Sequence, residues 1–288
     1  MEATELIRRV RRVELRARGL SNQIFSGEYH SAFKGRGMAF SENRAYQHGD
    51  EIRTIDWNVT ARMRSPYVKV FEEERELTAM LLIDVSASGT LGSRQKSKRE
   101  LAAELAAVLA FSAGQNNDKI GAVLFSDRIE RFIPPKKGRS HILRIVREII
   151  DLEPGGRGTD VTQALEHFGR VMKKRTIAFL ISDLQDDGFG DVLKRTARKH
   201  DLVALQLVDD VETKAARLGW LATTDPETGG TAFIDSSALR WRKRFDAASR
   251  RHQSEVEMLM KRSGVDHTVL NTGKPYVQPL MQLFDRRG

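Results

Sequence analysis

The sequence predicts an α/β protein in three layers, with a mainly parallel sheet flanked by helices. The apolar runs at 79–83, 119–125 and 176–181 have the length of strands and lack a polar face, which is typical of parallel strands buried on both faces. Helical patterns of about ten residues or more separate these runs, as expected for repeated strand–helix–strand units. Residues 1–77 are polar and interrupted by glycines, so we expect a small β-rich or irregular N-terminal region before an α/β domain at 78–288.

Each element is expected from a local pattern. Leu6, Val10 and Val13 have the spacing of a short amphipathic helix, whereas 67–71 alternates as a strand does. The run 129–133 also alternates and should end at Pro134-Pro135, so we place it at a sheet edge. The remaining expected elements are strands at 80–85, 119–125, 176–181, 202–208 and 265–270, helices at 100–113, 141–150, 161–172, 191–199, 238–260 and 277–284, and a hairpin formed by 220–222 and 232–234.

The composition is that of a globular protein without disulfides. Of the 288 residues, 40% are hydrophobic and none is cysteine, which excludes disulfides and thiolate metal sites. No run reaches the roughly 18 apolar residues of a membrane-spanning helix, and the Arg-rich start lacks the apolar part of a secretory signal, so we expect a cytoplasmic protein. The net charge of +9 favours a nucleic acid, an anionic membrane or an acidic protein surface as partner, although a solvated surface explains it equally well.

Hydroxyl and carboxylate side chains lie at the carboxyl ends of two predicted strands and in one loop that precedes a helix. The three segments are Asp84-Val85-Ser86-Ala87-Ser88 after the first core strand, Gly158-Thr159-Asp160 before a helix, and Ser182-Asp183 after a later strand. Loops at the carboxyl ends of parallel strands meet at one edge of a sheet, so these segments should converge. Turn and capping chemistry is the simpler alternative, and Asp160 in particular is expected to be a helix cap.

These oxygen-bearing side chains have the chemistry of a divalent cation site. Hydroxyls and carboxylates are hard ligands that suit Mg²⁺ or Mn²⁺, with water completing the coordination. We expect direct ligands from Ser86, Ser88 and Thr159, and contacts through water from Asp84 and Asp183. Without a cation the two carboxylates would raise each other's pKa. An open coordination position would accept a carboxylate from a partner protein.

At these residues the sequence resembles the metal-ion-dependent adhesion site (MIDAS) of von Willebrand factor type A domains. That pattern is Asp-x-Ser-x-Ser, then a distant Thr and a distant Asp, matched here by Asp84, Ser86, Ser88, Thr159 and Asp183. The resemblance implies a Rossmann-like, type A fold that binds one Mg²⁺ or Mn²⁺ and a protein. The sequence departs from many type A domains at Leu184, where they have Gly after the last Asp.

The N-terminal part resembles a second signature, that of the domain-of-unknown-function family fifty-eight. The run 44–57 carries it, followed by Ala61-Arg62, with Gly35-Arg36-Gly37, Phe71 and Glu74 in supporting positions. The resemblance covers roughly 26–208 and implies a partner of a MoxR-type AAA+ ATPase, in chaperone-like assembly or metal insertion. Its charged residues are expected to form an ion-pair network around Trp57, with a structural role or an interaction role; they are Arg44, Asp50, Arg53, Asp56 and Arg62.

Two other functions compete with a binding module. Haloacid dehalogenase–like phosphatases also place an Asp after the first strand, but their acid two residues later is Ser86 here, which leaves only Asp186-Asp187 as a late metal motif. Nucleic-acid binding would use the basic clusters at 173–175 and 240–251. We expect these bases to be a solvated helix face and Trp241 to belong to the apolar stripe, and we expect no enzymatic activity.

Overall fold

The computed structural model describes residues 3–25, 38–73, 77–90, 96–156, 158–213, 215, 217–224 and 230–287. The chain divides into two compact units. The large unit combines Met1–Phe33 with Thr78–Gly288, and the small unit is Lys34–Leu77.

A six-stranded sheet with the order β10-β7-β6-β3-β4-β5 forms the centre of the large unit. Five strands are parallel: β3 (Thr78–Asp84), β4 (Lys119–Phe125), β6 (Ile177–Ser182), β7 (Asp201–Val208) and β10 (Asp266–Asn271). Strand β5 (Ile129–Lys136) lies at the edge of the sheet, as its alternating pattern predicted, and pairs antiparallel with β4. It continues through Pro134-Pro135 instead of ending there, because an edge strand has one row of N–H groups without a strand partner.

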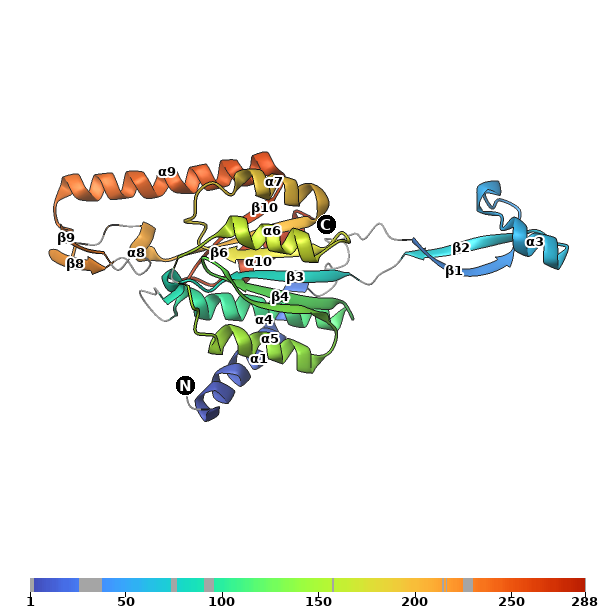
Figure 1. Cartoon of the computed structure of the whole chain (residues 1–288), viewed down its shortest axis with the longest axis horizontal. Helices are drawn as coiled ribbons and strands as arrows, with labels where there is room; N and C mark the ends of the chain where they lie inside the picture. Colours follow the sequence, from blue (N-terminus) through green and yellow to red (C-terminus); the bar gives the residue numbers. More distant parts are fainter. Residues whose placement is uncertain are drawn as a thin grey trace. The chain divides into compact units, whose positions relative to one another are not determined.

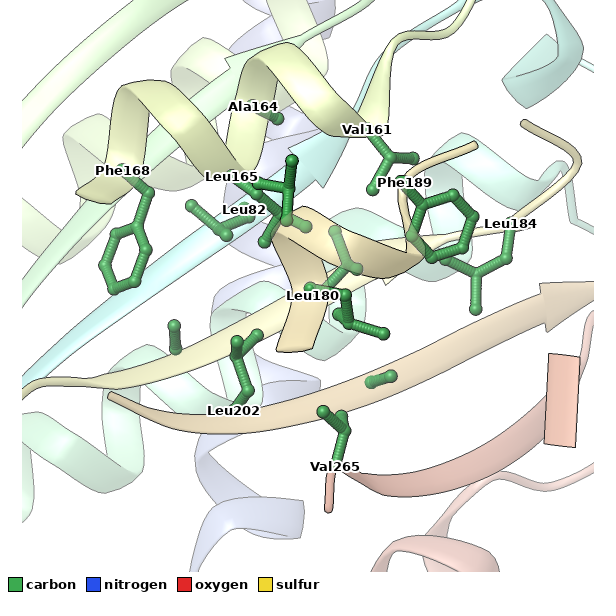
Figure 2. Packing of buried hydrophobic residues seen from close by; sticks show 14 of the residues in the cluster. Leu82, Val161, Ala164, Leu165, Phe168, Leu180, Leu184, Phe189, Leu202 and Val265 are labelled. Atoms are coloured by element: carbon green, nitrogen blue, oxygen red, sulfur yellow. The ribbon is translucent and has the colours of Figure 1, made fainter. Parts of the chain in front are cut away.

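Helices cover both faces of this sheet (Figure 1). One face carries α6 (Val161–Val171), α7 (Gly190–Lys199) and α9 (Leu239–Ser263), and the other carries α1 (Ala3–Phe25), α4 (Lys98–Gln115), α5 (Arg139–Asp151) and α10 (Val277–Asp285). Because side chains alternate along a strand, Met80 and Leu82 pack with Leu165, Phe168 and Leu193 on the first face (Figure 2). The predicted three-layer, mainly parallel α/β architecture is therefore confirmed.

Helix α1 belongs to the large unit, which differs from the predicted N-terminal region at 1–77. Its Ala17 is buried, and two ion pairs tie the helix to its neighbours: Glu14 to Arg139 of α5 at 2.7 Å, and Arg16 to Glu104 of α4 at 3.0 Å. The apolar pattern predicted only a short helix, because after Val13 the inner face of α1 continues with small and charged residues. Those residues become buried only when α4 and α5 are in place.

The small unit is a two-stranded antiparallel sheet with helical turns at its end. Strand β1 (Met38–Ala45) pairs with β2 (Tyr67–Glu73), whose strand conformation the alternation at 67–71 predicted. A 3-10 turn, η1 (Ile52–Thr54), and the short helix α3 (Trp57–Met63) connect them. The Gly35-Arg36-Gly37 and Glu74 positions of the predicted signature lie outside the described residues.

A short helix and a hairpin separate β7 from α9. Helix α8 (Asp210–Thr213) is followed by β8 (Trp220–Thr224) and β9 (Thr231–Asp235), which pair antiparallel as predicted. Within the described parts of the chain, no helix is long and apolar enough to span a membrane.

Candidate functional site

The first predicted segment forms a tight turn at the end of β3. Asp84 is the last residue of the strand, and its Oδ1 accepts a hydrogen bond from the backbone N–H of Ser86 at 2.9 Å. The chain then enters a 3-10 turn, η2 (Ala87–Thr90). The hydroxyls of Ser86 and Ser88 lie 2.9 Å apart. The Asp-x-Ser-x-Ser spacing therefore places one carboxylate and two hydroxyls on one short loop.

The other two segments reach the same carboxylate. Because β3 and β6 are parallel neighbours, Ser182 at the end of β6 lies beside Asp84 and donates to its Oδ2 at 2.7 Å. The Thr159 hydroxyl lies 3.5 Å from the same oxygen. Asp160 caps α6 by accepting from the backbone N–H of Gln163 at 2.7 Å, as predicted. The site thus lies where the chain order of the strands reverses, between β3 and β6.

The environment of Asp84 disfavours its charged form. Burial, followed by the nearby charge of Asp183, raises the pKa of Asp84 to about 6. Hydrogen bonds from Ser86 and Ser182 oppose this shift without cancelling it. A cation bound among these oxygens would favour the carboxylate and remove the cost.

A buried lysine completes the cluster, and sequence reasoning did not find it. Lys98, in the first turn of α4, places its Nζ 2.9 Å from Asp183 Oδ2 and 2.5 Å from Glu212 Oε1 of α8. Burial acts to lower the pKa of Lys98, but the charges of Asp183 and Glu212 together raise it. The two partners lie 85 and 114 residues away in sequence, so no local spacing could have indicated them.

The donor set fits one hard divalent cation, although it divides into two parts. Asp84, Ser86, Ser88 and Thr159 are linked by pairwise contacts, whereas Asp183 is held by Lys98 and by the backbone N–H of Gln185 at 3.3 Å. Among the residues that the structure describes, no group of three or more His, Cys, Asp or Glu side chains could hold a metal. The candidate set is of a different kind, with three hydroxyls and two carboxylates, which suits Mg²⁺ or Mn²⁺.

Leu184 occupies a backbone conformation that favours glycine. Its φ is +57°, in the left-handed region, at the position where many type A domains have Gly. Its side chain is nevertheless fully buried, in the core cluster with Val161 and Phe189 (Figure 2). Burial of the side chain therefore offsets the backbone strain, and the backbone N–H of Leu184 donates to the Ser182 hydroxyl at 3.1 Å.

The predicted ion-pair network around Trp57 does not form in the small unit. Arg44 binds Asp50 through two hydrogen bonds of 2.8 and 2.7 Å, but Asp56 caps α3 by accepting from the N–H groups of Asn58 and Val59. Trp57 is 67% exposed. Arg53 and Arg62 are also exposed and make no ion pair with any residue in the described part of the chain. Of the predicted network, the Arg44–Asp50 pair forms, whereas Asp56 pairs with Lys69 at 3.7 Å. The prediction that the charges surround Trp57 was wrong, because a two-stranded sheet has no second layer in which to bury the indole.

The residues considered for a phosphatase or a nucleic-acid-binding function make contacts within the fold. Asp186 Oδ2 accepts from the backbone N–H of Val161 at 2.8 Å, so this carboxylate holds the start of α6. Trp241 stacks on Phe245 with ring centroids 5.2 Å apart, and both are half-buried.

Residues 42–255 match the model of the family described as "Protein of unknown function DUF58". The chain belongs to the DUF58 family. An uncharacterized protein of Mycobacterium tuberculosis is 27% identical over 282 residues, which cover 96% of this chain and 88% of the relative. The predicted family is therefore confirmed.

Solved structures are similar to this DUF58 protein over much of its chain. An aerotolerance-related membrane protein from Bacteroides fragilis superposes with a TM-score of 0.50 and 15% identity, over 73% of this chain and 99% of the other. The SpRpn10 VWA domain gives a TM-score of 0.36 at 15% identity, over 73% of this chain and 95% of its own. With the sheet order described above, the similarity to the Bacteroides fragilis protein confirms the predicted three-layer, mainly parallel fold class.

Proposed function

We propose that this DUF58 protein is a metal-ion-dependent protein-interaction module. One Mg²⁺ or Mn²⁺ binds among Asp84, Ser86, Ser88 and Thr159, with Asp183 acting through water. When bound, the cation supplies a Lewis-acidic position that a carboxylate from a partner protein completes. The main support is that hydroxyls from two other segments, those of Thr159 and Ser182, reach the buried carboxylate of Asp84. A cation would stabilise that carboxylate in its charged form.

The contacts of Asp84 favour binding over catalysis in this proposal. Both of its carboxylate oxygens already accept hydrogen bonds, Oδ1 from the Ser86 backbone and Oδ2 from Ser182. A phosphatase of the kind considered above also needs a general acid two residues after its nucleophilic carboxylate, and that position is the hydroxyl of Ser86. The net charge of +9 would steer an acidic partner toward the protein.

The proposed partner is a MoxR-type AAA+ ATPase or a client that offers an acidic residue. This part of the proposal rests on the family resemblance, which implies an adaptor in chaperone-like assembly or metal insertion in the cytoplasm. A purified MoxR-type ATPase from the same organism should bind the immobilised protein in Mg²⁺ and dissociate when the metal is chelated. Binding that is equally strong in chelator would contradict a role for the metal.

Thermal unfolding with and without Mg²⁺ or Mn²⁺ tests the site directly. A cation at about 100 times its Kd stabilises the folded state by roughly 2.7 kcal/mol, which raises the Tm by a few degrees for a chain of this size. Asp84→Ala should abolish the shift. The matched control is Asp151→Ala, which removes an exposed carboxylate at the end of α5 and should keep the shift. No shift with either metal, or the same shift in Asp84→Ala, would contradict the proposal.

A further inference from the structure

The β8–β9 hairpin exposes large apolar side chains. Trp220 is 76% and Phe233 75% exposed, and Leu218 and Leu239 at the base of the hairpin are also exposed. Single exposed apolar residues are ordinary on protein surfaces, but a group of them marks a contact surface.

The strand register brings the two aromatic residues together. Trp220 pairs with Asp235 and Ala222 with Phe233, so both aromatic side chains lie on the same face as diagonal neighbours. Ser236 closes the base of the hairpin: its hydroxyl donates to the Gly219 carbonyl at 2.8 Å and accepts from the Leu218 N–H at 2.9 Å. The aromatic face is therefore held at the start of α9.

Basic side chains follow the hairpin in the sequence, at the start of α9. Four of the first six residues of α9 are Arg or Lys. Of these, Arg240, Lys243 and Arg244 are exposed and make no ion pair with any residue that the structure describes. Their charge is available to a partner.

The hairpin lies at the same end of the large unit as the carboxyl ends of the parallel strands (Figure 1). It follows α8, whose Glu212 binds Lys98, and Lys98 in turn binds Asp183. A protein that reaches Asp84 can therefore also reach the hairpin.

We propose that the aromatic face of β8–β9 and the first turns of α9 bind an acidic amphipathic segment of a protein partner. Apolar side chains of that segment pack on Trp220 and Phe233, and its carboxylates pair with Arg240, Lys243 and Arg244. Binding at this surface needs no metal, so this proposal can be tested independently of the function proposed above.

The charges around the hairpin favour a protein over a membrane or a nucleic acid. Asp235 lies opposite Trp220 in the register of the two strands, and the sequence that joins β8 to β9 adds Asp225 and Glu227. A flat anionic bilayer or a phosphate backbone that covered the aromatic face would meet Asp235 together with the bases. A folded peptide can instead pack its apolar groups on the aromatic rings, leave this carboxylate in solvent and place its own acids near α9.

The test uses the full chain in chelator and a fluorescent peptide of about 20 residues, with leucines at helical spacing and glutamates elsewhere. Fluorescence anisotropy should show binding that weakens at high salt. Trp220→Ala/Phe233→Ala and Arg240→Glu/Lys243→Glu/Arg244→Glu should each weaken it by about tenfold or more, as loss of central contacts does. Asp84→Ala should bind the peptide as the parent does.

Matched variants separate this surface from general stickiness and charge. Trp57→Ala removes an exposed tryptophan of the small unit, and Lys194→Glu/Arg195→Glu/Arg198→Glu reverses three exposed bases of α7. Both should bind the peptide as the parent does. The proposal is overturned if these controls lose binding equally, or if the parent does not bind. It is also overturned if phosphatidylglycerol-containing vesicles or single-stranded oligothymidine bind more tightly than the peptide through the same side chains.

Discussion

Two short ion pairs in this protein differ mainly in burial. Lys98 and Asp183 lie 2.9 Å apart at the carboxyl ends of the strands, with side chains that are each 3% exposed. Arg44 and Asp50 lie 2.7 Å apart in the small unit, with side chains 39% and 19% exposed. Water screens the second pair and leaves the first unscreened, so similar distances carry different energetic weight.

Removal of the buried Lys98 ammonium group should have the largest effect on the free energy of unfolding. Lys98→Met leaves the carboxylates of Asp183 and Glu212 without their counter-charge, and loss of one partner of a buried pair costs about 3 to 5 kcal/mol of unfolding free energy. Urea denaturation followed by circular dichroism measures this loss. Arg44→Met is the matched variant in the small unit and should change stability much less. Equal losses in the two variants would show that burial does not distinguish the pairs.

The two regions should also respond to pH with opposite sign. Asp84 has a raised pKa, so in chelator the folded state retains its proton while the unfolded chain has lost it, and stability falls as pH rises from about 4 to about 6. Asp84→Asn should remove this fall, which amounts to at most about 3 kcal/mol. The hydrogen bond from Arg44 instead lowers the pKa of Asp50, so its contribution is present above the unfolded pKa and is lost as pH falls.

Urea denaturation of Asp84→Asn and of Asp50→Asn at several pH values separates the contributions of the two carboxyl groups to stability. The difference between Asp84→Asn and the parent should grow with pH and level off above about 6. The difference for Asp50→Asn should shrink toward acid pH. A pH-independent difference for Asp84→Asn would contradict the raised pKa.

A smaller change in stability is expected from relief of backbone strain at two non-glycine residues with a left-handed backbone. Leu184 and Arg64 both have φ of +57°, but Leu184 is buried and Arg64 is exposed at the end of α3. Leu184→Ala and Leu184→Gly should both be less stable than the parent, with Gly the more stable of the two by about 1 kcal/mol because it relieves the strain. Arg64→Gly should stabilise the small unit, since no burial is lost. Thermal unfolding of the three variants checks this order, and if Leu184→Ala were the more stable of its pair, the strain argument would be wrong.

Much of the fold was predictable because its signals are local. The apolar runs of β3, β4 and β6 are continuous, since each strand is covered on both faces. The positions of Asp84 and Ser182 followed from the ends of strands, which lie at one edge of a parallel sheet, and that of Thr159 followed from the loop before α6. The place of α1 was not predictable in the same way, because its buried face consists partly of Glu14 and Ala17, whose partners lie on α4 and α5.

The charged residues show the limit of local reasoning. Asp56 was expected in an ion-pair network but caps a helix, because the first N–H groups of α3 need an acceptor. Lys98 and Glu212 carried no local signal, and only the packing of α4 and α8 against the strand ends brings them to Asp183.

The sequence by itself determined the layered α/β fold, the succession along the chain of its core strands and long helices, and the oxygen-bearing loops at one edge of the sheet. Periodicity and turn chemistry are properties of short segments, so these features need no knowledge of distant residues. Only the tertiary structure decided which charges are paired, how Leu184 tolerates its backbone, and that Trp220 and Phe233 face the solvent together. Burial and pairing depend on groups far apart in the chain, and electrostatic energies follow burial more than separation.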